Sequence, residues 1–322
     1  MKAAVYYETG PPEVFRIEEV PDPACPADGV VVDVEAVSIE GGDVGHRVQG
    51  ELAARPHIVG YQCAGVIREV GADVSGLEVG QRAVEINLDG SHAELRAAPA
   101  LSTWAIPDGV ETEAAACVPI PVGTADDCLF EFGQLQAGET VLVHAGGGGV
   151  GMAAIQLAKR AGATVLATAG TDEKLARLKE FGLDHGINYR EVDFVEAVRD
   201  VTGGRGVDVV VDSLGGQILE KSIEAAAYRG RISSVGGAAR DEYRPDVTLL
   251  RPTNKSLTGV FFGAELFNNH DRVHPMVAKH IADVGSGALQ VVVDRRFPLS
   301  EAAEAHRYIE SRKAFGRVLL IP

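Results

Sequence analysis

The sequence predicts an α/β protein, in which a mostly β domain is joined to a doubly wound parallel sheet. From Met1 to about Ala116, short apolar runs alternate with clusters of proline and glycine, which is typical of strands joined by turns. From about Gly123, apolar strand patterns alternate with helical patterns, and parallel strands need such crossover helices. The apolar run 140–145 leads directly into a glycine-rich run, 146–151.

In the first region the strand patterns are AAVYY, VVVDVEAV, GVIREVG and RAVEI. The predicted strands of the second region are 140–145, 164–170, 185–189, 207–214, 231–237 and 256–262, and its predicted helices are 150–161, 172–181, 191–201, 217–228 and 242–251. After Phe262, a helical region and the final strand GRVLLIP look unlike a seventh repeat of the sheet. We therefore expect residues 265–322 to return to the first domain (1–122), with 123–264 as the second domain.

Length and composition fit two ordinary domains. The chain has 322 residues, of which 46% are apolar and 24% charged, close to a globular average. Thirty basic against 46 acidic residues give a net charge of −16, which disfavours nucleic acid or an anionic membrane as a general partner. The N-terminus lacks the apolar core of a signal peptide, and no run of 18 apolar residues occurs, so we expect a cytoplasmic protein.

The cysteines show neither a C-x-x-C pair nor metal-knuckle spacing. We expect them to be reduced and mostly packed in the interior. They are Cys25, Cys63, Cys117 and Cys128.

The glycine-rich run predicts a phosphate-binding turn. Gly146, Gly148 and Gly151 fit the G-x-G-x-x-G spacing between a strand and a helix, which is typical of dinucleotide binding. The free N–H groups and the positive dipole end of the following helix would face the anion. A structural loop without a ligand is the alternative interpretation.

The end of the second strand of the sheet indicates which dinucleotide is bound. No carboxylate stands at its tip to bond a ribose 2′-hydroxyl, although Asp172 follows at once. Thr171 and Lys174 open the next helix, where a hydroxyl and a cation suit a 2′-phosphate, and Tyr189 ends the third strand. These residues favour NADPH over NADH; a plain N-cap, a surface lysine and a packed tyrosine are the alternatives.

Several motifs carry a family resemblance that extends from MKAAVYYETGPPEVFRIEEVP to the last residue. They include HAGGGGVGMAAIQLAKRAGATVLATAG, TDEKLARLKEFG, INYREVDF, VDVVVDSLGG and FPLSEAAEAHRYIESRKAFG. The chain resembles the quinone oxidoreductase (zeta-crystallin-like) branch of the medium-chain dehydrogenase/reductase superfamily. The resemblance implies a GroES-like catalytic domain, a Rossmann domain that binds NADPH, a cleft active site and a homodimer.

The resemblance also implies roles for individual residues. Gly147, Gly148, Gly149 and Val150 match the pyrophosphate loop, and Lys174 and Tyr189 match the residues that hold the 2′-phosphate. Ser213, Val235, Gly236 and Thr124 match positions beside the cofactor. Phe261 and Phe262 fall in the loop flanking the nicotinamide, and Arg317 falls where a side chain near the C-terminus can meet the cofactor.

The zinc-dependent members of the superfamily need a cysteine near the position of Ser38 and a His-Glu pair after Gly60. This chain has Ser38 and Tyr61-Gln62 instead, so we predict no catalytic metal. Glu40, Asp43 and His46 are spaced i, i+3, i+6 in a stretch that reads as a polar loop. We expect these side chains to be solvated and not to bind a metal.

Without a Lewis acid, the reaction must depend on positioning and on an activated substrate. A quinone or an α,β-unsaturated carbonyl compound meets this need, because conjugation carries the new charge to oxygen. Tyr61 is the predicted donor to that oxygen, and His46 or Glu40 the predicted source of the second proton. The alternatives are a core tyrosine for Tyr61, a surface loop histidine for His46 and a structural acceptor of backbone N–H groups for Glu40. The family usually has Asn and Pro where Glu40 and Gly41 stand.

Two other functions stay open. The first is an enoyl reductase that acts on a CoA-bound or carrier-bound chain, and the second is a non-catalytic NADPH-binding protein of the crystallin or RNA-binding kind. A homodimer is also expected on physical grounds, because the apolar strand 256–262 would otherwise leave a bare sheet edge.

Overall fold

The computed structural model describes all 322 residues, and the chain divides into two compact units. Unit 1 comprises Met1–Ile120 and Ala264–Pro322, and unit 2 comprises Pro121–Gly263. Each of these boundaries lies within two residues of the predicted one. None of the helices combines the length and the apolar character that a membrane crossing requires.

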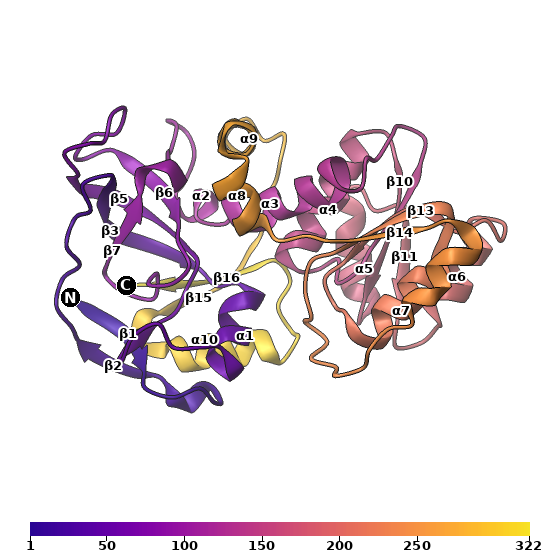
Figure 1. Cartoon of the computed structure of the whole chain (residues 1–322), viewed down its shortest axis with the longest axis horizontal. Coiled ribbons are helices and arrows are strands. Elements are labelled where there is room, and N and C mark those ends of the chain that lie inside the picture. Colours follow the sequence, from indigo (N-terminus) through magenta and orange to yellow (C-terminus); the bar gives the residue numbers. More distant parts are fainter. The chain divides into compact units, whose positions relative to one another are not determined.

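Unit 1 is built mainly of strands, in a larger sheet of order β15-β16-β3-β5-β6-β8 with β7 paired to β3, and a smaller sheet of order β2-β1-β4 (Figure 1). The strands are β1 (Lys2–Tyr6), β2 (Arg16–Glu19), β3 (Gly29–Ser38), β4 (His57–Ile58), β5 (Gln62–Val70), β6 (Arg82–Ile86), β7 (Leu95–Pro99), β8 (Thr103–Ala105), β15 (Val293–Pro298) and β16 (Arg317–Ile321). Strand β16 pairs with β3, so the end of the chain completes a sheet that its beginning starts.

The helices of unit 1 close its core. They are α1 (Gly41–Gln49), α2 (Thr112–Ala115), α9 (His270–Gly285) and α10 (Ala302–Glu310), with short turns η1 (Pro12–Val14), η2 (Ala100–Ser102) and η6 (Leu299–Glu301). Helices α3 (Pro119–Asp126) and α8 (Phe262–Asn268) lie at the two boundaries between the units. One core cluster joins Val37 of β3, Val44 of α1, Ala305 of α10 and Leu320 of β16, so α1 and α10 are held by apolar burial.

Helix α1 corrects the prediction of a polar loop at this position. Three glycines in nine residues give it a poor intrinsic propensity. The helix forms because Asp43 accepts a hydrogen bond from the backbone N–H of Glu40 at 2.7 Å and because Val44 and Arg47 are buried. The prediction that the carboxylates here are solvated is also wrong, since Glu40 and Asp43 are 6% and 0% exposed.

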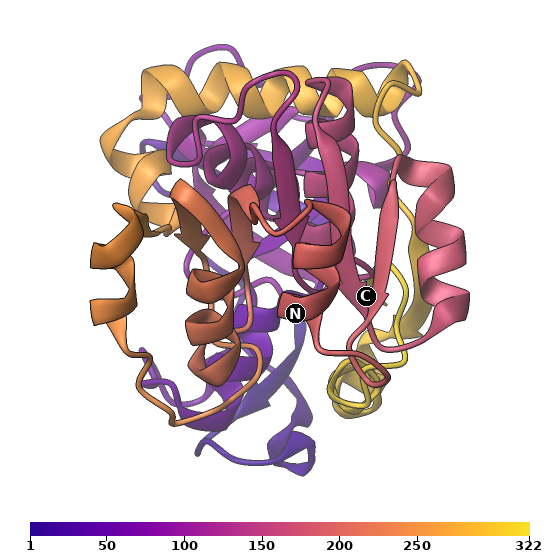
Figure 2. The same cartoon turned by 90° about the vertical axis from the view of Figure 1, so that its right-hand side faces the viewer.

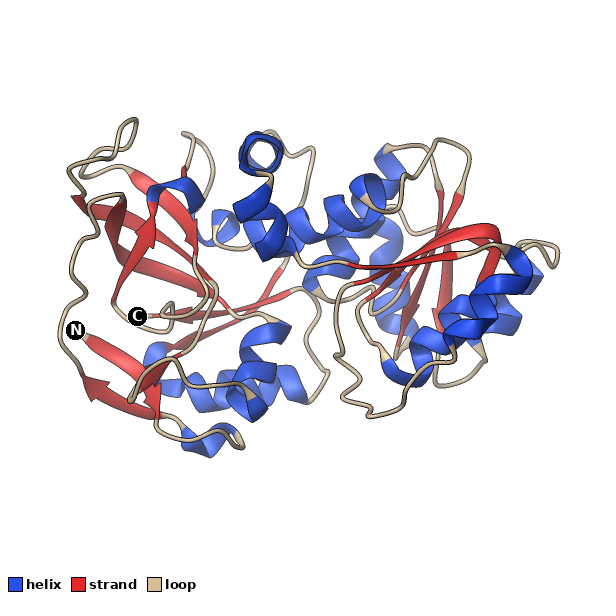
Figure 3. Ribbon diagram, viewed as in Figure 1, coloured by secondary structure: helices blue, strands red, loops and turns tan.

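Unit 2 is the predicted doubly wound parallel sheet, and Figures 2 and 3 show its strands with helices packed against them. The strand order is β11-β10-β9-β12-β13-β14. Its strands are β9 (Thr140–Val143), β10 (Thr164–Ala169), β11 (His185–Asn188), β12 (Val207–Asp212), β13 (Ala226–Ser234) and β14 (Ser256–Gly259). Its helices and turns are α4 (Gly149–Arg160), α5 (Asp172–Leu178), α6 (Phe194–Val201), α7 (Gly216–Ala225), the π-helical η3 (Asp127–Glu131), η4 (Lys179–Phe181) and η5 (Val247–Thr253).

Apolar burial fixes the helices of unit 2 on the sheet. Leu142, Leu166 and Val210 of three neighbouring strands share one cluster with Phe194 of α6 and Ile223 of α7, which places these two helices on one face. All six predicted strands are present. The predicted helix 242–251 is wrong in its first half, because Pro245 interrupts the segment and only the 3₁₀ turn η5 forms, starting at Val247.

Candidate functional site

The glycine-rich turn joins β9 to α4. The N-cap of α4, Gly148, carries no side chain, so no side-chain acceptor covers the amide groups of the first turn. A Cβ built on Gly151 would lie 2.3 Å from the carbonyl oxygen of Ala145, and only glycine allows so close an approach of helix and turn. Gly147, Gly149 and Val150 thus lie at the positive end of a 12-residue helix, the usual position for a phosphate.

The tip of β10 carries the residues predicted to meet a 2′-phosphate. Thr171 caps α5, since its hydroxyl accepts a hydrogen bond from the N–H of Lys174 at 3.3 Å. A Cβ built on Gly170 would lie 2.9 Å from the hydroxyl oxygen of Tyr189 and 3.3 Å from Nε of Arg190. The structure thus brings a phenol and a guanidinium over the same glycine.

The acidic residue next to this tip is held elsewhere. Asp172 accepts a hydrogen bond from the side-chain amide of Asn188 at 3.0 Å, which draws its carboxylate to β11. Sequence reasoning missed Arg190, although its position directly after Tyr189 at the end of the third strand could have indicated it. An exposed cation beside a phenol at this tip suits a phosphate better than a ribose hydroxyl.

The loops that follow β12 and β13 touch each other. Ser213 accepts a backbone hydrogen bond from Ala238 at 3.0 Å, and Val235 donates one to Asp212 at 2.8 Å. A Cβ built on Gly236 would lie 3.3 Å from the carbonyl oxygen of Ser213. The structure therefore brings Ser213, Val235 and Gly236 together at one edge of the sheet, where parallel α/β sheets bind ligands.

Two of the residues predicted to contact the cofactor are buried and not exposed at the surface. Phe262 begins α8 and is 3% exposed; its ring packs against Gly123, where a Cβ would lie 2.4 Å away. The expectation of a loop residue is therefore wrong for Phe262, although Phe261 is 67% exposed. Thr124 is also buried, within α3.

Unit 1 holds a buried polar cluster around Arg317. The guanidinium donates to the hydroxyl of Ser38 at 2.7 Å, to the carbonyl of Ile39 at 2.8 Å and to the carboxylate of Glu40. Gln62 also donates to Glu40 and accepts from the N–H of Ile120. The guanidinium is thus bound within unit 1, and the contact of Arg317 with a cofactor stays a prediction.

Glu40 is placed as a partner of Arg317 and not as an exposed proton donor. Burial raises the pKa of Glu40, while the Arg317 guanidinium and the Gln62 amide act in the opposite direction and favour the carboxylate. A buried ion pair of this kind has a structural role: it links Glu40 to Arg317. The predicted proton relay through Glu40 has no support in this geometry.

Tyr61 lies across the start of α1. A Cβ on Gly42 would lie 2.3 Å from Cε2 of the Tyr61 ring, so the ring rests on bare backbone. Its N–H donates to Asp43 at 3.2 Å. Burial raises the pKa of Tyr61 to about 12, with help from the charges of Asp43 and Glu40. Tyr61 therefore keeps its proton at neutral pH and can donate it in a hydrogen bond.

His46 is turned toward the smaller sheet. Its Nδ1 lies 3.2 Å from the hydroxyl of Tyr6, and its ring stacks on His57 with centroids 4.9 Å apart. The structure thus places the three predicted catalytic residues differently: Tyr61 on the α1 backbone, Glu40 in an ion pair, and His46 stacked on His57 and hydrogen-bonded to the Tyr6 hydroxyl.

No three histidine, cysteine or acidic side chains gather closely enough to hold a metal ion. The guanidinium of Arg317 lies on Ser38, the position where zinc-dependent relatives carry a cysteine. Burial raises the pKa of the Cys117 thiol to about 11, even though Ser38 and Arg317 act to lower it. This corner of unit 1 therefore offers a fixed cation and a neutral thiol.

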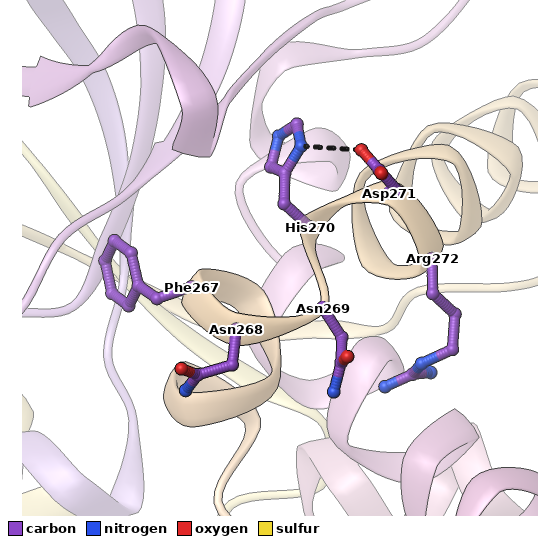
Figure 4. A pocket seen from close by; sticks show the side chains of 6 residues that line it. All are labelled: Phe267, Asn268, Asn269, His270, Asp271 and Arg272. Atoms are coloured by element: carbon purple, nitrogen blue, oxygen red, sulfur yellow. Dashed lines mark ion pairs between the residues drawn. The ribbon is translucent and has the colours of Figure 1, made fainter.

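A shallow hollow of about 320 Å³ lies where α8 meets α9, lined by Phe267, Asn268, Asn269, His270, Asp271 and Arg272 (Figure 4). His270 turns toward Asp271, at 3.9 Å, while Phe267 points away from Arg272. None of the predicted site residues lines this hollow, and the function proposed below does not use it.

A β unit and a doubly wound unit with a glycine-rich turn after its first strand define a medium-chain, nucleotide-dependent dehydrogenase. The "Alcohol dehydrogenase GroES-like domain" family matches residues 26–121, and the "Zinc-binding dehydrogenase" family matches residues 149–279. The chain belongs to the quinone oxidoreductase (zeta-crystallin-like) branch of the medium-chain dehydrogenase/reductase superfamily.

Three relatives illustrate this membership. A 2-haloacrylate reductase from Burkholderia is 32% identical over 99% of this chain and 98% of its own. A quinone oxidoreductase from Rattus norvegicus is 29% identical over 100% and 98%. The crystal structure of Escherichia coli quinone oxidoreductase complexed with NADPH matches with a TM-score of 0.93, 27% identity and full coverage of both chains.

Proposed function

We propose that this chain is an NADPH-dependent oxidoreductase that reduces a quinone or an α,β-unsaturated carbonyl compound without a catalytic metal. The observation that carries the proposal is the tip of β10, where the Tyr189 hydroxyl and the Arg190 guanidinium lie over Gly170 while Asn188 holds Asp172 aside. That arrangement offers donors to a 2′-phosphate. The relatives support the reaction class: they are named for reduction of a quinone or a haloacrylate, and one is complexed with NADPH.

The residues of unit 2 would hold the cofactor. The first turn of α4 would offer amide groups to the diphosphate, and Thr171, Lys174, Tyr189 and Arg190 would meet the 2′-phosphate. When bound, NADPH supplies a hydride to the substrate. The side chains orient the cofactor and the substrate and exclude water from them. Positioning is therefore the main catalytic contribution of the protein.

Tyr61 is the residue that we assign to the substrate oxygen. Its raised pKa keeps the phenol protonated, so it can donate a hydrogen bond to the oxygen on which negative charge develops. The backbone of Gly42 supports its ring and Asp43 fixes its N–H. The one proton that completes the reduction comes from solvent in this proposal, because Glu40 is closed off by Arg317.

The side chains around Ser38 support the proposed independence from zinc. Arg317 lies on Ser38 and pairs with Glu40, so a cation bound there would meet a fixed guanidinium at close range. Displacing Arg317 would leave the buried carboxylate of Glu40 without its ion-pair partner, and an unpaired buried charge costs free energy.

We further propose a cytoplasmic homodimer with no nucleic-acid partner. Strand β14 is the edge of its sheet and pairs with β13 alone, so a second copy can extend the sheet there. All four cysteines are free thiols, as expected in a reducing compartment. Sedimentation of the purified chain measures the oligomeric state.

The decisive experiment is oxidation of NADPH against benzoquinone, naphthoquinone, enones and enoyl thioesters, with NADH as the control cofactor. We expect NADPH to be preferred and a quinone or an enone to be reduced fastest. An enoyl thioester in first place would move the chain to the carrier-bound alternative, which its net charge of −16 already disfavours for an anionic CoA ester. Binding without turnover of any electrophile would indicate the non-catalytic alternative.

Replacing Arg190 with alanine tests the 2′-phosphate assignment. We expect the KM for NADPH to rise about tenfold, the low end for a charge-assisted bond because Arg190 is exposed, and the KM for NADH to stay unchanged. Lys179→Ala is the matched control, since it removes an exposed cation from the turn that follows α5. Equal effects of Arg190→Ala on both cofactors would contradict the assignment.

A further inference from the structure

Beneath the glycine-rich turn, unit 2 contains a line of buried polar side chains that the proposed function does not use. His144 follows β9, Thr168 belongs to β10, Asp212 ends β12 and Ser222 lies in α7. All four are at most 2% exposed. Each buried polar group costs free energy unless it is hydrogen-bonded. These four side chains therefore need hydrogen-bond partners in the interior of the unit.

The four side chains form a continuous chain of hydrogen bonds. Nδ1 of His144 lies 3.1 Å from the hydroxyl of Thr168, and Nε2 lies 3.0 Å from the hydroxyl of Ser222. Ser222 donates to Oδ2 of Asp212 at 2.7 Å. The N–H of Ala145 donates to the Thr168 hydroxyl at 3.3 Å, so every nitrogen and hydroxyl in the chain has a partner.

The carboxylate sets the direction of every bond. Asp212 can only accept, so the single proton of the Ser222 hydroxyl points to it; the carbonyl of Ile218, at 2.8 Å, is a weaker competitor. Ser222 then accepts from Nε2–H of His144. His144 Nδ1 is left as the acceptor for Thr168, which in turn accepts from Ala145.

The two ends of this chain are the loops assigned to the cofactor. At one end Ala145, whose φ is +51°, opens the glycine-rich turn, and Gly146 donates to the backbone of Thr168 at 2.9 Å. At the other end Oδ1 of Asp212 accepts from the N–H groups of Leu214 and Gly215, at 2.9 and 2.8 Å. Those two residues directly follow Ser213.

We propose that His144 is a positioning residue for NADPH: through Thr168 on one side and Ser222 and Asp212 on the other, it fixes the glycine-rich turn relative to the Ser213 loop. The inference rests on the proposed function. A dinucleotide that spans both loops binds tightly only when their spacing is set beforehand, because ordering them on binding costs affinity. His144 thus lies outside contact with the cofactor but controls the geometry that receives it.

The hydrogen-bond chain requires a neutral imidazole at His144. Burial lowers the pKa of His144, although the charge of Asp212 acts in the opposite direction. A proton on both ring nitrogens would leave Nδ1 without a role as acceptor and would reverse the Thr168 bond. The hydrogen-bond chain through His144 therefore keeps its direction at neutral pH.

The test compares two ligands on the same variants. In the proposed binding mode NADPH would span both loops, whereas adenosine 2′,5′-bisphosphate would reach the residues around Gly170 and the glycine-rich turn but not the Ser213 loop. Ser222→Ala should raise the Kd of NADPH about fivefold, as expected for one buried hydrogen bond, while the Kd of the bisphosphate stays within about twofold. Ser233→Ala is the matched control: its hydroxyl is equally buried and donates to the carbonyl of Cys128 at 2.8 Å, so its removal breaks no bond of the His144 chain.

Three results would overturn the positioning role. They are equal weakening of both ligands by Ser222→Ala, an unchanged Kd for NADPH, and a shift no larger than that of Ser233→Ala. Failure of the wild-type chain to bind either ligand would instead overturn the proposed function, so the two failures are distinguishable.

A second measurement needs no variant. Imidazole ¹⁵N spectra of the wild-type protein should show His144 as the Nε2–H tautomer, unchanged between pH 8 and pH 6. The Nδ1–H tautomer would reverse the chain and overturn the inference. A double-mutant cycle adds to this: Thr168→Val and Ser222→Ala should be non-additive in the Kd of NADPH, because both act through His144.

Discussion

Replacing His92 with glutamine should make unit 1 less sensitive to acid. His92 and His306 are buried and face each other, with 3.1 Å between their Nε2 atoms. Arg47 donates to Nδ1 of His306 at 3.3 Å, so Nε2 of His306 carries the proton and donates it to His92. The second nitrogen of His92 meets the hydroxyl of Ser91 at 3.3 Å. Neither ring has room for a further proton.

The magnitude follows from the pKa values. Burial lowers the pKa of His92 from 6.5 to about 3, and the charge of Arg96 adds to the effect; burial also lowers the pKa of His306. The unfolded chain therefore takes up protons at these sites first, so the stability they contribute is present above pH 6.5 and is lost as the pH falls toward 3. At pH 5 the lowered pKa of His92 costs about 2 kcal/mol of stability.

Asp43 works in the opposite direction. Burial raises its pKa from 3.8 to about 8, so its contribution to stability is complete below pH 3.8 and is lost as the pH rises through 8. The pH profile of the wild-type protein alone therefore mixes opposing effects. The difference between wild type and variant cancels Asp43 and isolates His92.

Urea unfolding at pH 7.5 and pH 5.0, followed by tryptophan fluorescence, measures this difference. The chain has a single tryptophan, Trp104, which is buried in unit 1, so the signal reports the unit that contains the pair. His92→Gln keeps an acceptor for His306 and should reduce the loss of stability between the two pH values by about 2 kcal/mol.

The control is His185→Gln, which removes an exposed histidine of β11 in unit 2 and should leave the difference unchanged. An equal loss in wild type and His92→Gln, within about 0.5 kcal/mol, would refute the reasoning. It would mean that the native pair binds protons as readily as the unfolded chain does.

Two further predictions concern the site itself. Gly151→Ala should weaken NADPH binding at least tenfold and lower the Tm, because its Cβ would lie 2.3 Å from the Ala145 carbonyl oxygen; Gly259→Ala, with open space around it, is the control in binding and melting assays. Tyr61→Phe should lower kcat roughly a hundredfold, as for loss of one oxyanion donor, with the KM for NADPH unchanged. Tyr308→Phe, which loses a hydroxyl bonded to Asp294, is its control in steady-state kinetics, and an unchanged kcat in Tyr61→Phe would remove Tyr61 from the reaction.

Features set by local sequence could be predicted. The strand patterns of unit 2 and the glycine-rich turn are read from neighbouring residues, because side-chain periodicity and glycine spacing act over a few positions. Thr171 as an N-cap is a local property of the same kind. The return of the chain end to the first domain was also accessible, since the pattern after Phe262 departs from the repeat of the sheet.

Features set by distant partners could not be predicted. Arg317 and Glu40 are 277 positions apart, and His92 and His306 are 214 apart; no local pattern links them. Helix α1 was missed for the same reason. Its glycines argue against a helix, and the burial that stabilises it comes from β16 and α10.

The Arg317–Glu40 pair also bears on the choice of substrate. A zinc ion would act as a Lewis acid on a substrate carbonyl, whereas here the charge of Arg317 is neutralised by Glu40 in the same buried contact. A neutral pair polarises a nearby carbonyl weakly, since the fields of its two charges oppose each other. A saturated ketone would therefore receive little activation beyond one hydrogen bond from Tyr61. A conjugated substrate brings its own delocalisation, and for that reason the electrostatics of unit 1 favour quinones and enones over simple ketones.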